Sequence, residues 1–252
     1  MSAPYRINAF GQPIGKDLAH WSAPPFPPRR VLEGWGCRLE PLAASHAASL
    51  WQAFSADDGR MFTYLTSGPF NDAEHCLQWV AQCAAQTDPQ YYAIVDAASG
   101  LALGVASYLR IMPQDGCLEV GWLHFSPALQ QSRLATAAMV LLMQNAFALG
   151  YRRYEWKCDS LNVPSRRAAQ RLGFSFEGIH RQVRVTQRRN RDTAWYSILD
   201  QEWPALRTVL HAWLADTNFD ATGKQRQSLS ALTLPLLAAR DPVLEQTRIA
   251  FQ

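Results

Sequence analysis

The sequence predicts an α+β protein with a mixed, mostly antiparallel sheet flanked by helices. Two β-rich runs, residues 91–95 and 103–109, read as a hairpin around the turn-rich stretch 96–100, and the turn Asp115-Gly116 leads into a further strand. From Leu118 onward, strand-like and helix-like patterns alternate along the chain. Such an alternation is typical of a sheet that carries helices on its faces.

Composition and charge narrow the functional classes. The chain has 252 residues, of which 48% are hydrophobic and 18% charged, which suits one sizeable domain with extensions. A formal net charge of +3 does not indicate a nucleic-acid binder. Five cysteines show no metal-ligand spacing, and no signal peptide or transmembrane run is present. We therefore expect a reduced, cytoplasmic protein without a metal site and without a membrane partner.

We expect three segments along the chain. Residues 1–30 are a proline-rich arm, either packed on the domain through its aromatic side chains or loosely ordered. Residues 31–216 are the folded domain, and residues 217–252 are a C-terminal extension. The apolar part of that extension, residues 229–239, is interpreted as a packed tail or as a homodimer contact.

The stretch 118–147, LEVGWLHFSPALQQSRLATAAMVLLMQNAF, reads as a strand, a polar turn and a long helix. Ser126-Pro127 ends the strand, residues 130–133 form the turn, and apolar residues recur at helical spacing from Leu134. A helix N-terminus presents unpaired N–H groups and the positive end of the helix dipole, which suits a phosphate. Arg133 would add a full positive charge at that place.

The next segment continues the pattern and completes a motif pair. Residues 154–158 read as a strand, residues 163–172 as a short helix, and Phe174 starts another strand. The informative runs are EVGW at 119–122, TAA at 136–138 and NVPSRRAAQRLGFSFEG at 162–178. In this order they resemble the GNAT acyltransferase superfamily, in particular its ribosomal-protein N-acetyltransferase-like (RimJ/RimL) branch. The resemblance covers about residues 32–199.

The resemblance implies a fold and a cofactor. The GNAT fold is layered α/β/α, with six to seven strands, a splayed central strand pair and acetyl-CoA or another acyl-CoA as the acyl donor. The cofactor-binding positions would be Trp122, Leu123, His124 and Phe125 along the pantetheine, Gln130, Gln131, Ser132, Arg133, Leu134, Ala135 and Thr136 around the pyrophosphate, and Asn162 and Ser165 near the sulfur. Arg133 stands where the family pattern has its middle glycine, which usually allows a close backbone approach to the phosphates.

The resemblance also implies catalytic roles. Glu119 lies eleven positions before Gln130, the spacing of a general base in many GNAT enzymes; a strand glutamate paired with an arginine is the alternative. His124 is a second candidate base, but strand alternation puts it on the opposite face from Glu119 unless a bulge intervenes. Ser165 would donate to the leaving thiolate, because the position of the usual tyrosine acid is Ala169. Ser165 as a helix cap, or a reaction without a general acid, stay open.

The acceptor side is less specific. In the family the segment between the first two helices lines the acceptor pocket, so Phe62 and Tyr64 are candidate contacts, with plain packing as the alternative. Residues 181–191, RQVRVTQRRNR, read as a basic hairpin that begins with Arg181. It is interpreted as a solvated hairpin, as a clamp for an acidic acceptor or as a contact to nucleic acid. The acidic base of the ribosomal-protein enzymes matches Arg184, which weakens the analogy with their substrates.

The resulting functional hypothesis is an N-acyltransferase that moves an acetyl or other acyl group from acyl-CoA to a primary amine by direct attack in a ternary complex. A small-molecule or peptide amine is the expected partner. Two alternatives remain: a catalytically impaired CoA-binding or regulatory module, and an aminoacyl-tRNA-dependent acyltransferase. The sequence does not identify the acceptor, the acyl chain length or the oligomeric state.

Overall fold

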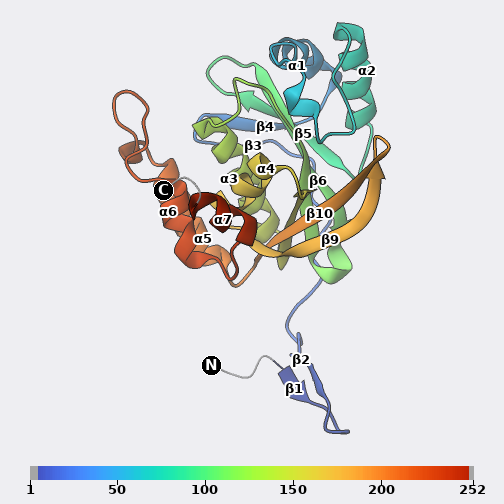
Figure 1. Ribbon diagram of the computed structural model, residues 1–252, viewed down its shortest axis with the longest axis vertical. Helices are drawn as coiled ribbons and strands as arrows, with labels where there is room; N and C mark the ends of the chain where they lie inside the picture. Colours follow the sequence, from blue (N-terminus) through green and yellow to red (C-terminus); the bar gives the residue numbers. More distant parts are fainter. Residues whose placement is uncertain (1–4, 250–252) are drawn as a thin grey trace.

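The protein is built on one mixed sheet of eight strands, in the order β3-β4-β5-β6-β7-β8-β10-β9. A computed structural model describes residues 5–249 (Figure 1). All neighbours pair antiparallel except β7 and β8, which are parallel. The strands are β3 Leu32–Gly34, β4 Cys37–Pro41, β5 Gln90–Asp96, β6 Ala102–Met112, β7 Cys117–Phe125, β8 Arg153–Asp159, β9 Ser175–Thr186 and β10 Arg189–Leu199. The predicted fold is confirmed, with eight strands rather than six or seven because the short β3 adds to the sheet edge.

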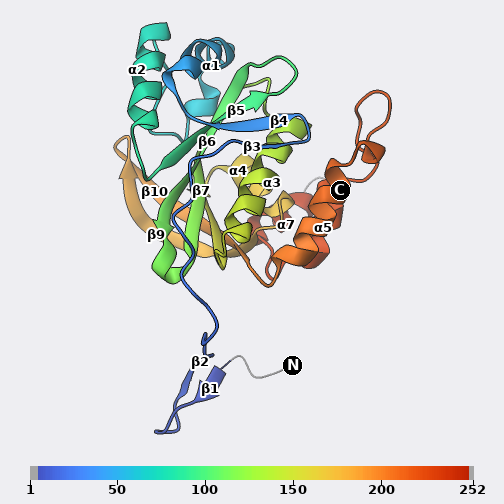
Figure 2. The same cartoon turned by 180° about the vertical axis from the view of Figure 1, so that it is seen from behind.

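Helices cover both faces of this sheet (Figures 1 and 2). The alternation of β5 explains the two layers: Tyr92 and Ile94 pack with α3, whereas Tyr91, Ala93 and Val95 pack with α1 and α2. The helical segments are η1 Ala44–His46, α1 Ala47–Phe54, η2 Arg60–Phe62, α2 Ala73–Ala84, η3 Pro113–Asp115, α3 Arg133–Ala148, α4 Val163–Arg171, α5 Trp203–Leu214, η4 Asp216–Asn218, α6 Leu229–Thr233, η5 Leu234–Leu236 and α7 Pro242–Ile249. Within the described residues, no helix combines the length and the apolar character needed to cross a membrane.

The central strands β7 and β8 diverge along their length. They pair only from Cys117 opposite Arg153 to Val120 opposite Trp156. Beyond that point β7 stays paired with β6 as far as Phe125, while β8 stays paired with β10. The predicted splayed strand pair is thus confirmed, and a wedge opens between the two strands.

The N-terminal segment has two parts. The hairpin of β1 Tyr5–Ile7 and β2 Pro13–Gly15 stands away from the body of the protein (Figures 1 and 2). The stretch before β3 is docked: Gln90 Nε2 donates to the Pro27 carbonyl at 2.8 Å, and Tyr151 Oη donates to the Pro25 carbonyl at 3.1 Å. The stretch before β3 is therefore packed on the domain, while the ordered hairpin before it projects from the body.

The C-terminal segment packs on its own domain. Helices α6 and α7 contact α4, and α6 also contacts α5. Arg166 of α4 and Asp241 form an ion pair of 2.6 Å in which both side chains are almost fully buried. Burial would raise the pKa of Asp241, but hydrogen bonds from Arg166 and Tyr196 hold it below its ordinary value. The apolar segment 229–239 therefore has an intramolecular role as a packed tail, and a homodimer stays a prediction.

Candidate active site

A large cavity opens where β7 and β8 diverge. Its volume of about 1770 Å³ exceeds the roughly 300–1,000 Å³ of a pocket for one drug-sized ligand. It is lined by β6, β7 and β8, the start of α3, α4, the loop after α1, the β9–β10 hairpin and the C-terminal segment. The cavity therefore has room for a long cofactor and a second ligand together.

Strand β7 carries a β-bulge where it borders this cavity. The register passes from Ser107 opposite Gly121 to Val105 opposite His124, so β7 carries one residue more than β6. Trp122 takes up the irregularity with a left-handed φ of 52°. Leu123 and Trp122 both line the cavity, while Trp122 also packs against the core under α1 and α2 and Leu123 against the core under α3.

The bulge occurs, but it does not bring His124 into the cavity. The imidazole is fully buried, with ring centroids 6.2 Å from Phe54 and 4.7 Å from Trp79. One ring nitrogen lies 2.9 Å from Ser67 Oγ and the other 3.0 Å from the Trp122 carbonyl. Burial lowers the pKa of His124 to about 4. The His124 side chain is thus a core residue rather than a general base, and only its backbone can serve a cofactor.

The turn before α3 forms an anion cradle. Ser132 is the N-cap residue, and its hydroxyl accepts from the Ala135 N–H at 2.9 Å. The N–H groups of Gln131, Arg133 and Leu134 have no acceptor among the residues that the structure describes. Gln130, Gln131, Ser132, Ala135 and Thr136 line the cavity here. Free N–H donors at the positive end of a 16-residue helix suit a phosphate group.

The side chain of Arg133 does not contribute to this cradle. It contacts the Leu214 carbonyl, forms a 2.6 Å ion pair with Asp216 and lies 4.5 Å from the Phe219 ring centroid. Leu134 packs against the main core and does not line the cavity either. The expectation that the Arg133 charge faces the phosphates is therefore wrong, because the first helical residue projects sideways toward α5.

Arginines of α4 supply positive charge at this end of the cavity instead. Arg167 and Arg171 both line it. Arg171 donates to Thr136 Oγ1 at 3.1 Å, and its guanidinium lies 4.8 Å from the Trp213 ring centroid. Sequence reasoning missed both residues, although the spacing of four positions that places them on one helix face was visible.

Asn162 and Ser165 meet at the start of α4, beside the wedge. Asn162 is the N-cap residue, and its side-chain oxygen accepts from the Ser165 N–H at 3.1 Å. Its amide NH₂ has no acceptor within the described part of the chain. Ser165 Oγ accepts from Trp156 Nε1 at 3.1 Å, which leaves the hydroxyl its own proton to donate. Both line the cavity, and the cap is Asn162 rather than Ser165.

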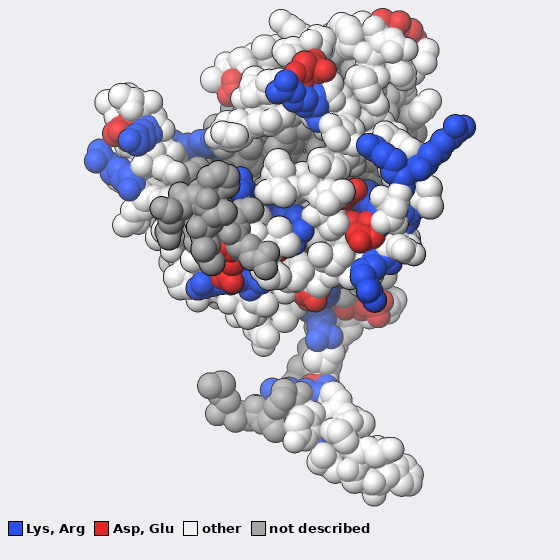
Figure 3. Space-filling view, viewed as in Figure 1, with Lys and Arg blue, Asp and Glu red and all other residues white. Residues whose placement is uncertain are grey.

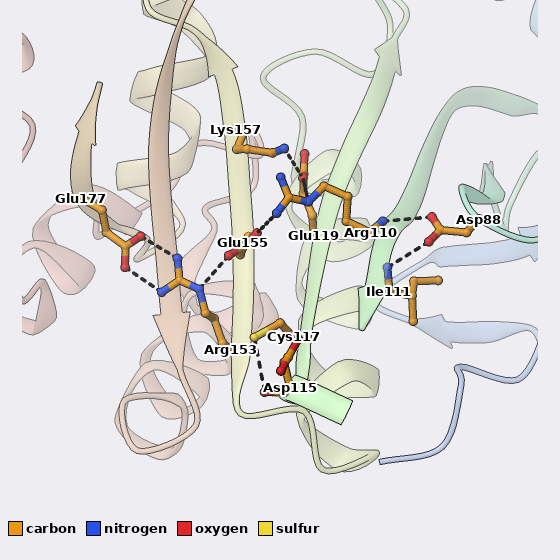
Figure 4. A network of polar contacts seen from close by, with 10 residues as sticks. All are labelled: Asp88, Arg110, Ile111, Asp115, Cys117, Glu119, Arg153, Glu155, Lys157 and Glu177. Atoms are coloured by element: carbon orange, nitrogen blue, oxygen red, sulfur yellow. Dashed lines mark hydrogen bonds and ion pairs between the residues drawn. The ribbon is translucent and has the colours of Figure 1, made fainter. Parts of the chain in front are cut away.

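Glu119 lines the cavity from β7 as a buried, ion-paired carboxylate (Figure 4). Its Oε2 lies 2.8 Å from Lys157 Nζ and 3.8 Å from Arg110 Nε. Burial raises the pKa of Glu119 above its ordinary value, while Lys157 and Arg110 oppose that rise. Burial likewise lowers the pKa of Lys157, against the pull of Glu119. Glu119 thus faces the cavity, as a general base would. It is also ion-paired on its strand, as the alternative interpretation of a paired strand glutamate predicts.

The cations around Glu119 were missed by sequence reasoning. Lys157 is one of three lysines and lies on a predicted strand two positions after Glu155, which was the available signal. Lys157 and Arg110 lie 4.6 Å and 5.1 Å from the ring centroid of Trp195, which also lines the cavity. The Asp88 carboxylate accepts hydrogen bonds from the N–H groups of Arg110 and Ile111 at 2.9 and 3.0 Å (Figure 4). These bonds fix a bulge in β6, where Arg110 has a φ of 49°.

The loop after α1 lines one end of the cavity. Tyr64 lines the cavity, and its hydroxyl donates to the Leu161 carbonyl at 3.1 Å. Phe62 is only 4% exposed and packs in the second core at 5.7 Å between ring centroids from Phe70. Of the two predicted acceptor contacts, only Tyr64 therefore faces the cavity. For Phe62 the alternative of plain packing holds.

The β9–β10 hairpin contributes different arginines from the one predicted. Arg184 and Arg191 line the cavity and Arg181 does not, although Arg181 and Arg184 are both exposed and Arg191 is half-buried. Between Arg184 opposite Arg191 and His180 opposite Thr193, β9 carries two extra residues, and Arg181 lies within this irregular stretch. The prediction of Arg181 as a substrate contact is not supported by its position.

Comparison with known proteins identifies the family. Residues 37–175 match the family described as "Acetyltransferase (GNAT) domain". A crystal structure of a GCN5-related N-acetyltransferase from Brucella melitensis is 44% identical, with a TM-score of 0.84, covering 86% of this chain and 99% of that one. A probable acetyltransferase of the GNAT family from Chromobacterium violaceum ATCC 12472 is 43% identical, with a TM-score of 0.72, covering 77% and 98%. The chain therefore belongs to the GNAT acetyltransferase family.

More distant similarity shows the fold alone. The ribosomal L7/L12 α-N-protein acetyltransferase RimL is 20% identical, with a TM-score of 0.59, covering 68% of this chain and 94% of that one. No curated protein matches the chain.

Proposed function

We propose that this protein is an N-acyltransferase that moves an acetyl group from acetyl-CoA to a primary amine by direct attack in a ternary complex. One observation carries the proposal: a single cavity joins a capped helix N-terminus with free N–H groups to a buried carboxylate on the splayed strand. The two ends provide what acyl transfer from a thioester to an amine needs, namely a phosphate cradle and a proton acceptor.

The residues around the wedge fit the cofactor. Bound acetyl-CoA supplies a thioester carbonyl that is open to attack by an amine. The N–H groups of Gln131, Arg133 and Leu134 hold the pyrophosphate, and Arg171 adds charge. The free edge of β7 beyond Val120 offers backbone groups to the pantetheine amides, and the Asn162 NH₂ offers a further donor.

Glu119 acts as the proton acceptor for the incoming amine, directly or through a water. The amine nitrogen forms a bond to the carbonyl carbon, the carbon–sulfur bond breaks, and the ammonium proton passes to Glu119. The Ser165 hydroxyl donates a hydrogen bond to the departing sulfur, which finally carries the proton as a thiol. A pKa raised by burial makes Glu119 a stronger base than an exposed glutamate.

The finer assignments belong to the same proposal. From the Asn162-x-x-Ser165 pattern we infer membership of the RimJ/RimL-like branch. We further infer that the protein acts in the cytoplasm and that its acceptor is a small-molecule or peptide amine. Arg184, at the position of the acidic base of the ribosomal-protein enzymes, favours an acceptor other than a ribosomal protein.

A second candidate is a CoA-binding module without turnover. The 2.8 Å ion pair between Glu119 and Lys157 favours it, because a neighbouring ammonium lowers the proton affinity of a carboxylate. Ala169, at the position of the usual tyrosine acid, points the same way. This candidate predicts acetyl-CoA binding with no thiol release for any amine.

The test begins with calorimetric titration of acetyl-CoA. We expect micromolar binding that Asn162→Ala weakens about tenfold, through the lost donor and the lost helix cap. Arg133→Ala should leave the affinity within about twofold, since its side chain contacts α5 and η4 rather than the cavity. The absence of binding would refute the acyl-CoA mechanism.

The catalytic step is tested by thiol release with an amine panel. Glu119→Gln should lower kcat by about 10²- to 10⁴-fold at unchanged KM for acetyl-CoA. Glu177→Gln is the matched control, because Glu177 forms a 2.6 Å ion pair with Arg153 on the neighbouring strands but does not line the cavity. Equal kcat losses in both variants would show that Glu119 is structural.

A further inference from the structure

Arg184 and Arg191 form an unusual pair in the acceptor half of the cavity. They are direct register partners on β9 and β10, and both line the cavity, Arg184 as an exposed and Arg191 as a half-buried side chain. Like charges directly opposite each other on neighbouring strands destabilise a sheet. Among the described residues neither of them has a carboxylate partner, whereas Arg153 and Lys157 on the adjoining strand are ion-paired. The two arginines therefore have no counter-charge from the protein, and an anionic ligand can supply one.

Two further donors at this end have no acceptor. Arg191 Nε and Trp195 Nε1 are buried and unpartnered among the residues described. A buried N–H without a partner carries a desolvation penalty of about 1–3 kcal/mol, so such groups are uncommon unless something else satisfies them. Both groups are donors, and the matching ligand group is therefore an acceptor, such as an oxyanion.

The same strand links these donors to the proposed base. Arg191, Thr193 and Trp195 all line the cavity from β10, and Trp195 lies beside Lys157 and Arg110 at the Glu119 site. From Arg191 to Trp195 the strand advances four residues, or about 13 Å. The long arginine side chains can reach part of this distance, so a bound anion can lie nearer to Glu119. An anion held by the arginines and an amine at Glu119 can therefore belong to one small molecule.

We propose that the acceptor is an amine that carries an oxyanion, a carboxylate or a phosphate, bound between Arg184 and Arg191. The inference rests on the proposed N-acyltransferase function and adds the class of acceptor. The arginines hold the anionic end, and the amine reaches Glu119 at the wedge. Lys and Arg side chains gather over the end of this hairpin, whose outer arginines face solvent (Figure 3).

The experiment compares matched acceptors on the acetyl-CoA-loaded protein. The probes are ω-amino carboxylates from glycine to 6-aminohexanoate, each against the alkylamine of equal length, and O-phosphoethanolamine against ethanolamine. Thiol release should show a kcat/KM at least tenfold higher for one oxyanion amine than for its neutral partner. Whether the preferred probe is a carboxylate or the phosphate identifies the source of the oxyanion.

Variants connect the preference to the arginine pair. Arg184→Gln and Arg191→Gln should each raise KM for the preferred acceptor about ten- to a hundredfold, with KM for acetyl-CoA and kinetics of the neutral amine unchanged. Arg188→Gln removes the same charge at the exposed hairpin tip, outside the cavity lining, and should behave as wild type.

The outcomes separate the two proposals. Transfer to neutral and anionic amines with equal efficiency, or identical behaviour of all three variants, overturns the inference and leaves the acyltransferase function standing. If calorimetry shows no oxyanion amine binding better than its neutral partner, the inference is likewise overturned. Salt-dependent RNA binding lost in Arg184→Gln and Arg191→Gln, with unchanged amine kinetics, would replace it by a nucleic-acid contact. Failure of acetyl-CoA to bind would refute the function itself.

Discussion

His124 illustrates how burial decides the chemistry of a single side chain. Its ring is enclosed by the aromatic cluster under α1 and α2, and its nitrogens contact Ser67 and the Trp122 carbonyl. Burial lowers the pKa of His124 from an ordinary value of 6.5 to about 4. The folded protein therefore holds a neutral imidazole at pH values where the unfolded chain already binds a proton.

The free energy of unfolding should consequently fall with acidification. The contribution of His124 is complete above about pH 6.5 and is lost as the pH falls from 6.5 to 4, by up to about 3 kcal/mol. Urea titrations of wild type and His124→Asn at several pH values measure the free energy of unfolding. In the variant, the fall of this free energy between pH 6.5 and 4 should lack the contribution of His124. His20→Asn, exposed in the N-terminal segment, is the matched control and should follow the wild type.

At the scale of elements, α4 is fixed by the segment that follows the domain. Its Arg166 is 2% exposed and pairs with a fully buried Asp241, while the neighbouring Asn162 and Ser165 face the cavity. Leu234 and Leu244 of the C-terminal segment also line the cavity. The docking of this segment therefore positions α4 and completes one wall of the cavity.

Breaking this contact should be costly. Asp241→Ala leaves the Arg166 guanidinium buried without a counter-charge, and we expect a loss of about 3–5 kcal/mol in the free energy of unfolding. Acetyl-CoA affinity should fall in parallel, because the cavity wall loosens. Arg240→Ala breaks an exposed 3.5 Å pair with Glu245 and should change stability by less than about 1 kcal/mol. Similar stabilities of the two variants would contradict this account.

At the scale of the whole molecule, the N-terminal segment divides at about residue 20. The projecting hairpin exposes Tyr5, Ile7 and Phe10, and Phe10 is 87% exposed. The following stretch has buried Pro24 and Pro27. Stability should therefore depend on the second part and not on the first.

Two truncations test this division. A chain starting at residue 21 should unfold within about 1 kcal/mol of the full chain, because the hairpin makes few contacts with the body. A chain starting at residue 31 loses the acceptors of Gln90 and Tyr151 and the Arg30 donor to Asn145. Each buried group left unpaired costs about 1–3 kcal/mol, so the free energy of unfolding of this chain should fall by several kcal/mol. Equal midpoints in chemical denaturation would show that residues 21–30 do not stabilise the domain.

The order of elements could be predicted because local signals encode it. Strand and helix periods, the turn before α3 and the Asn162-x-x-Ser165 pattern are set by residues close in sequence. The sheet class, the splayed pair and the GNAT family follow from that order. The helix N-terminus and Asn162 could likewise be placed at the site, because capping is a local interaction.

Side-chain directions in the site depended on the tertiary structure. The bulges at Trp122, Arg110 and in β9 arise from pairing with neighbouring strands, and they lie on strands that border the cavity. His124 is buried under α1 and α2, Arg181 faces solvent, and Arg110 lines the cavity. Lys157 and Trp195 reach Glu119 from strands far along the chain. Strand register is a non-local property, so the sequence by itself determined the order of the elements and the capped start of α3, and only the assembled sheet decided which charges surround Glu119.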